Sequence, residues 1–163
     1  MDLRENWSQI CVAFDASIKS SLHCAIATTS ADGYPHITPI GHIFLRDDYT
    51  AFYFEEHTKK MPRNIADNPR VCLLLVNSNR WFWARSLFMG RFLTPPGIRL
   101  VGVADERRLA TEQERSAYQA RVKPFRKLKG YGLIWKDLRY VRDIALQGFE
   151  PVMYPNMTDG LWK

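Results

Sequence analysis

The chain has 163 residues, of which 46% are hydrophobic and 25% are charged. This length and composition are typical of one globular domain that buries roughly two thirds of its unfolded-chain surface, so a disordered or fibrous protein is excluded. Lysine and arginine exceed aspartate and glutamate by six, a moderate excess that identifies no partner by itself. We therefore expect a single domain over residues 1–163.

The cysteine and histidine spacings favour neither a metal site nor a disulfide framework. Cys11, Cys24 and Cys72 stand singly in apolar surroundings, and the four histidines show no H-x-x-x-H or H-E-x-x-H spacing. No basic segment followed by an apolar stretch opens the chain, and no run approaches the ~20 apolar residues of a membrane span. We expect a cytoplasmic protein with no metal and no membrane partner.

The first twenty residues predict an amphipathic helix over about residues 3–20. Its apolar positions recur at steps of three and four, namely Leu3, Trp7, Ile10, Cys11, Phe14 and Ile18. After it, the short apolar segment 24–29, the turn residues 31–33 and the alternating segment 34–45 predict a β-hairpin. The aromatic segment 49–55 suits a third antiparallel strand, so these three strands should form a meander.

Two prolines interrupt the second predicted strand. Pro35 and Pro39 have no N–H group to donate to a central ladder. This strand should therefore lie at a sheet edge, contain a bulge, or turn these positions toward a partner other than a strand, such as a planar ligand.

A short helix and a buried strand should follow. Thr58 can cap the helix and Asn68-Pro69 ends it, after which the apolar run 71–76 has the length of a buried strand.

The last third of the chain predicts further strands and one helix. Residues 98–104 read as a strand, and the capping box from Thr111 to Glu114 begins a helix that ends near Val122. Residues 131–154 predict one or two final strands with a break at Gln147-Gly148.

Thr58, Lys59, Lys60 and Arg63 form the most informative cluster. One hydroxyl and three cations meet at the start of the short predicted helix, whose free N–H groups also attract an anion. A phosphate could bind there. The alternative is a solvated helix face of no special function, because such basic patterns are common on surfaces.

Two other segments leave alternatives open. Trp81, Phe82 and Trp83 lie beside Arg80 and Arg85, an arrangement compatible with stacking on bases or a flavin, or with core packing or a dimer interface. The basic segment 121–129 predicts a solvated surface, with a nucleic-acid or acidic partner as its alternative. No recognised nucleic-acid-binding motif is present, so nucleic acid is not the expected partner.

Three strings in this order resemble the pyridoxamine 5′-phosphate oxidase-like family of FMN-binding split barrels. They are residues 25–41 (AIATTSADGYPHITPIG), residues 58–71 (TKKMPRNIADNPRV) and residues 98–104 (IRLVGVA), the last followed by the capped helix. The resemblance implies a mainly β protein with peripheral helices, in which a six-stranded antiparallel split β-barrel spans about residues 22–154. It also implies a homodimer that holds FMN at the subunit interface.

The resemblance implies a set of cofactor-binding residues. The second strand would lie along the isoalloxazine ring, which places His36, Ile37, Thr38, Pro39 and Ile40 beside it. The end of the third strand and the next helix would hold the FMN phosphate through Glu55, Thr58, Lys59 and Lys60, with Arg63 as an addition.

The implied activity is that of a flavin-dependent oxidoreductase acting on a small molecule. Met61 stands where the oxidases carry a further basic residue, Gly97 replaces a polar residue, and the C-terminal tail lacks their Arg-x-His signature. These departures weaken a pyridoxamine phosphate activity more than they weaken FMN binding. Because the flavin carries the redox chemistry, no side chain is assigned a catalytic role. Alternatives are the same fold binding deazaflavin or haem, and a non-catalytic flavin- or nucleic-acid-binding module.

Overall fold

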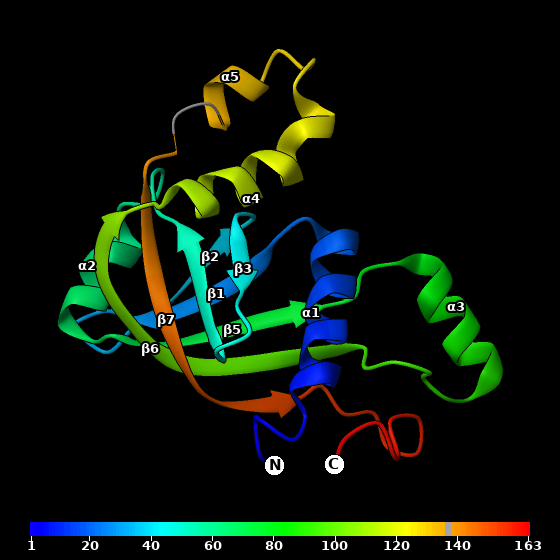
Figure 1. Cartoon of the computed structure of the whole chain (residues 1–163). Helices are drawn as coiled ribbons and strands as arrows, with labels where there is room; N and C mark the ends of the chain where they lie inside the picture. Colours follow the sequence, from blue (N-terminus) through cyan, green and yellow to red (C-terminus); the bar gives the residue numbers. More distant parts are fainter. Residues whose placement is uncertain (136–137) are drawn as a thin grey trace.

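The computed structural model describes residues 1–135 and 138–163, and in them one curled antiparallel sheet of seven strands is surrounded by helices (Figure 1). Residues 136–137, which fall within the expected barrel span, lie outside the described residues. The mainly β, split-barrel prediction is confirmed. The elements in chain order are α1 (Trp7–Ser21), β1 (Cys24–Thr29), β2 (Pro35–Ile40), β3 (Ile43–Leu45), β4 (Thr50–Phe54), α2 (Lys60–Asp67), β5 (Arg70–Val76), α3 (Arg80–Met89), β6 (Gly97–Leu109), α4 (Glu112–Val122), the 3₁₀ turn η1 (Lys123–Phe125), α5 (Tyr131–Ile134) and β7 (Tyr140–Pro151).

The strand order is β2-β1-β5-β6-β7-β4-β3, which corrects the predicted meander. The hairpin of β1 and β2 is confirmed, but the predicted strand 34–45 is divided at Gly41 and His42 into β2 and β3. These two strands lie at opposite edges of the sheet, and β4 pairs with β3 and β7 rather than with β2. The sheet has seven strands instead of six because of this division.

Helix α1 covers one face of the curled sheet. Ile10, Ala13 and Phe14 are buried in the main core together with apolar residues of β1, β5 and β6. The helix begins at Trp7 rather than at Leu3, because Asp2 accepts the N–H groups of residues 4 and 5 in a separate turn. Leu3 still packs against the core.

Strand β4 is buried on both faces and joins two apolar clusters. Ala51 and Tyr53 point into the main core, while Phe52 and Phe54 pack in a second cluster with Tyr118 of α4. The predicted capping box is confirmed: Thr111 N–H donates to Glu114 at 2.8 Å, and Glu114 N–H donates to the Thr111 hydroxyl at 3.2 Å.

The predicted break at Gln147-Gly148 is a β-bulge inside one long strand. Val101 of β6 pairs with Gly148 and Gly102 pairs with Leu146, so Gln147 is the extra residue. A Cβ at Gly102 would meet the Ala145 carbonyl oxygen at 2.5 Å, so the strands approach this closely only because residue 102 is glycine.

A network of charged side chains fixes α4 to the sheet. Glu114 accepts hydrogen bonds from Arg46 at 2.5 Å and from Arg108 at 2.7 Å, and both arginines also contact Asp143. The bond from Arg108 lowers the pKa of Glu114 to about 2, with further lowering by the Thr111 N–H group and Arg46 against the opposing effect of burial.

This network predicts acid sensitivity. Because the pKa of Glu114 in the fold lies below its ordinary 4.5, its stabilisation is complete above that pH and is lost as the pH falls toward about 2. Glu114→Gln weakens charge-assisted bonds in a partly solvated network, so it should lower the free energy of unfolding by roughly 1–3 kcal/mol at neutral pH and flatten its decline in acid. Urea denaturation across this pH range measures both effects. The exposed Glu112, which pairs only with Arg115, provides the control: Glu112→Gln should change the free energy by less than about 1 kcal/mol, and equal losses in the two variants would contradict the assignment.

Candidate cofactor site

Strand β2 forms an exposed edge of the sheet, as the prolines predict. It pairs with β1 alone, with Pro35 opposite Thr29 and Pro39 opposite Ala25. Pro35, Ile37 and Pro39 are exposed, and 67% of the Ile37 surface is accessible. An apolar surface with an unpaired backbone edge is therefore available to a flat ligand.

The other face of β2 turns toward the molecule. His36 and Thr38 are half-buried, with their Nδ1 and Oγ1 atoms 3.3 Å apart, and Ile40 is buried in the main core. Four of the five residues predicted to lie along the ring thus remain partly or fully accessible. The side chain of Ile40 supports the barrel instead.

The predicted phosphate residues gather where α2 begins. Lys59, Lys60 and Arg63 are exposed, and no side chain caps the helix. Thr58 was expected to be the cap, but the helix starts one residue later, with Lys59 in the capping position. Within residues 1–135 and 138–163, the buried Oγ1 of Thr58 has no hydrogen-bond partner. An orphaned hydroxyl beside two lysines and an uncapped helix start fits a phosphate group.

Two contacts position α2 against the hairpin. The Asn64 side chain donates to the Thr28 hydroxyl of β1 at 3.0 Å, and Met61 and Ile65 are buried in the core. The pKa of Asp32 in the hairpin turn is lowered by a hydrogen bond from Ser30 and, more weakly, by the charge of Lys60. Lys60 therefore lies near the turn from which β2 starts.

Glu55 differs from the other predicted phosphate residues. Only 2% of its surface is accessible, and its carboxylate accepts bonds from Arg142 at 2.8 and 2.9 Å and from the Tyr53 hydroxyl at 2.7 Å. The Glu55 side chain thus stabilises the interior of the barrel rather than joining the exposed lysines. Its partner lies 87 residues away in sequence, so no local pattern reveals this pair.

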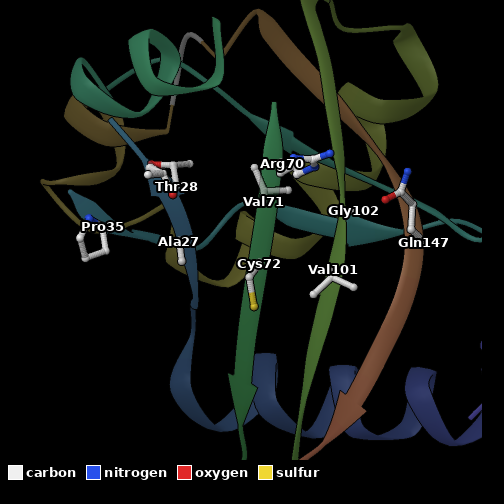
Figure 2. Close-up of a pocket in the computed structure, with 10 residues that line it drawn as sticks. Ala27, Thr28, Pro35, Arg70, Val71, Cys72, Val101, Gly102 and Gln147 are labelled. Atoms are coloured by element: carbon white, nitrogen blue, oxygen red, sulfur yellow. The ribbon is translucent and has the colours of Figure 1, made fainter. Parts of the chain in front are cut away.

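The outer face of the sheet is open and contains a shallow cavity of about 340 Å³ (Figure 2). Five strands contribute to its wall, including Ala27, Pro35, Arg70, Cys72, Val101 and Gln147. Strand β5 was expected to be wholly buried, but only Val71, Leu73 and Leu75 are, while Cys72 and Leu74 face outward. No local sequence pattern predicts this cavity, because its residues come from separate strands.

A model of the pyridoxamine 5′-phosphate oxidase family matches residues 12–145, which is most of the chain. The chain belongs to the pyridoxamine 5′-phosphate oxidase family. No curated protein matches it.

Solved structures of similar fold have different ligands in their names. HutZ, the heme storage protein from Vibrio cholerae, is 17% identical with a TM-score of 0.55, over 84% of this chain and 89% of its own. An FMN-binding protein from Syntrophomonas wolfei is 14% identical with a TM-score of 0.58, over 93% and 95% of the two chains. An F420 reductase is 14% identical with a TM-score of 0.53, over 84% and 95%. At these identities the likeness establishes the fold.

Two departures from the pyridoxamine 5′-phosphate oxidase pattern have structural reasons. Met61 is fully buried in the main core, so a basic side chain there would lack both water and a partner. At Gly97, a Cβ would meet the Leu75 carbonyl oxygen at 2.6 Å, which leaves no room for a polar side chain. Both residues serve the packing of this chain.

The segment that contains Trp81, Phe82 and Trp83 forms helix α3, which the sequence did not predict. Asn79 caps it by accepting the N–H groups of Trp81 and Phe82, and Phe82 and Trp83 pack with Phe92. Figure 1 shows α3 on the side of the sheet opposite α2. Trp81, which is 84% exposed, therefore cannot reach the α2 site of its own chain. Phe82 and Trp83 are half-buried in a local aromatic group with Phe92 and Tyr154, outside the two apolar clusters of the barrel.

Two histidines and the helices bear on metal binding and on a membrane span. His23 and His57 are exposed and lie within hydrogen-bond distance of the Ser21 and Ile134 carbonyl oxygens. In the described part of the chain, no group of three or more His, Cys, Asp or Glu residues is placed to hold a metal ion. The described helices include none with the length and apolar character required to cross a bilayer.

Proposed function

We propose that this chain binds FMN and acts as a flavin-dependent oxidoreductase on a small molecule. The observation that carries the proposal is the buried, unpartnered Thr58 Oγ1 beside Lys59 and Lys60 at the uncapped start of α2. Three charge-assisted contacts of about 1.5–3 kcal/mol each would suffice to hold a phosphate there. Family membership and the FMN-binding structural relative support this assignment.

The exposed edge of β2 suits the flavin ring. Ile37 and Pro39 offer apolar surface, and the unpaired strand edge offers backbone groups to the polar rim of the ring. Lys60 lies near the turn that leads into β2, so phosphate and ring could be held by adjacent elements. When bound, FMN would supply the redox chemistry, while the chain would bind, orient and shield it.

The open sheet face supports a homodimer. Ile37 and Leu74 are 67% and 38% exposed, and the hollow beside Cys72 is bordered by further apolar residues. Apolar surface on a sheet face commonly marks an interaction site. A second copy of the chain would cover this face and enclose the cofactor between the subunits.

The absorption spectrum of the protein as purified, followed by reconstitution with FMN, tests the cofactor. We expect flavin absorbance that elutes with the protein in gel filtration, and quenching of FMN fluorescence when FMN is added to cofactor-free protein. A Soret band would indicate haem, and a single near-ultraviolet band would indicate deazaflavin. Either spectrum, or absence of both co-elution and quenching, would refute the proposal.

A further inference from the structure

A second cavity, of about 450 Å³, lies between α1, α4 and the turn that joins β2 to β3. Its volume is within the range of small-molecule sites. None of the predicted cofactor residues lines it. Its wall includes Tyr118 and Arg121 of α4, together with His42 and Trp135.

Tyr118 presents a hydroxyl that the described residues do not satisfy. Its side chain is 3% exposed, and the buried Oη has no hydrogen-bond partner within residues 1–135 and 138–163. Buried tyrosine hydroxyls are normally paired, because an unpaired one destabilises the fold. A ligand oxygen that reaches this hydroxyl from the cavity would provide the missing partner.

Arg121 places a positive charge in the same wall. It donates to the Ile43 carbonyl oxygen at 2.5 Å, and its guanidinium lies 3.6 Å from the centre of the Phe44 ring. Among the side chains that the structure describes, no carboxylate lies within 4 Å of it, and burial lowers its pKa. A cation in such surroundings favours an anionic ligand.

The remaining groups restrict the charge and shape of that ligand. Asp15 and Lys19, both exposed at the rim, carry opposite charges, and the charge of Asp15 also acts on Arg121. Burial, with the nearby charges of His57 and Arg121, lowers the pKa of His42 to about 4, so its ring is neutral at neutral pH. The formal charges of Asp15, Lys19 and Arg121 then sum to plus one, which matches a monoanion better than a dianionic phosphate ester.

The rest of the wall is apolar and includes two further aromatic side chains. Ile18 and Val122 are buried, Phe125 and Trp135 are half-buried, and the His42 ring contacts the Tyr118 ring edge-on. We propose that this cavity binds a small, flat, apolar monocarboxylic acid, with its carboxylate on Arg121 and the Tyr118 hydroxyl. Binding does not require FMN.

Isothermal titration calorimetry with 2-naphthoate as the probe tests the site. We expect saturable binding of 2-naphthoate, with 2-naphthamide and 2-naphthyl phosphate each weaker by about tenfold, the effect of one charge-assisted contact. No binding of the carboxylate by folded protein, equal binding of the amide, or tighter binding of the phosphate ester would overturn the proposal. The titration is made on cofactor-free protein, so a failure of FMN binding leaves its result interpretable.

Tyr118→Phe gives the sharpest variant. It removes only the unpartnered hydroxyl, so the thermal midpoint should stay equal or rise while 2-naphthoate binds about two- to tenfold more weakly. Arg121→Gln should reduce binding by at least about tenfold, whereas Arg126→Gln, an exposed arginine of the same segment, should leave it unchanged. Unchanged binding in Tyr118→Phe, or equal losses in the two arginine variants, would contradict the assignment.

Discussion

Replacing Arg142 by methionine should lower the free energy of unfolding by about 3–5 kcal/mol. The Glu55 carboxylate, which is 2% exposed, then has no cationic partner. The Tyr53 hydroxyl is its remaining side-chain donor. A buried charge that loses its partner costs far more than the pair contributed, because its desolvation is no longer offset. Urea denaturation at neutral pH measures the loss.

Two further variants show whether the effect arises from the pair. Arg139→Met removes a nearby exposed arginine and should change the free energy of unfolding by less than about 1 kcal/mol. The double variant Glu55→Leu with Arg142→Met should be more stable than Arg142→Met alone, since it removes the stranded carboxylate. A loss below about 1 kcal/mol in Arg142→Met would refute the structural role assigned to Glu55.

Replacing Lys59 and Lys60 together by alanine should weaken FMN binding by about 10²- to 10⁴-fold. The estimate follows from two charge-assisted contacts of about 1.5–3 kcal/mol each, at about 1.4 kcal/mol per tenfold change. Riboflavin has the same ring and no phosphate, so its affinity should change by less than about threefold. Fluorescence titration of both ligands against both proteins measures the four dissociation constants.

The control variant removes the same net charge at a different place on the protein. Lys127 and Lys129 are exposed in the segment after α4, and their double replacement by alanine removes the same two charges elsewhere. FMN affinity should fall only slightly in that variant, through the long-range field. Equal losses for FMN and riboflavin, or a similar loss in the control, would remove the phosphate assignment from α2.

Local signals in the sequence predicted the elements whose causes are local. The hairpin of β1 and β2 follows from a short apolar run and a turn at Ala31-Asp32-Gly33, and Gly33 has a positive φ of 85°. The capping box fixes the start of α4 through contacts between residues three apart. Pro35 and Pro39 indicated an edge strand because they cannot donate hydrogen bonds, whatever the rest of the chain does.

Features that depend on distant parts of the chain could not be predicted in this way. The division of the segment 34–45 into two strands at opposite sheet edges depends on β7 pairing with β4. Glu55 stands close in sequence to Lys59 and Lys60, which suggests that it belongs to the same site. Its partner Arg142, however, lies on β7, 87 residues further along the chain.

The second cavity was missed for the same reason. His42 and Tyr118 meet only in the folded chain, and the basic segment that starts at Arg121 predicted a solvated surface. Arg121 is partly buried in the folded chain, whereas the lysines that follow it are exposed.

Titration of the wild-type protein with FMN and with riboflavin, side by side, tests whether the start of α2 binds the cofactor phosphate. If Thr58, Lys59 and Lys60 hold the phosphate, FMN should bind at least about a hundredfold more tightly than riboflavin, as two or three charge-assisted contacts require. Equal affinity for the two ligands, or binding of neither, would show that these residues do not hold the FMN phosphate.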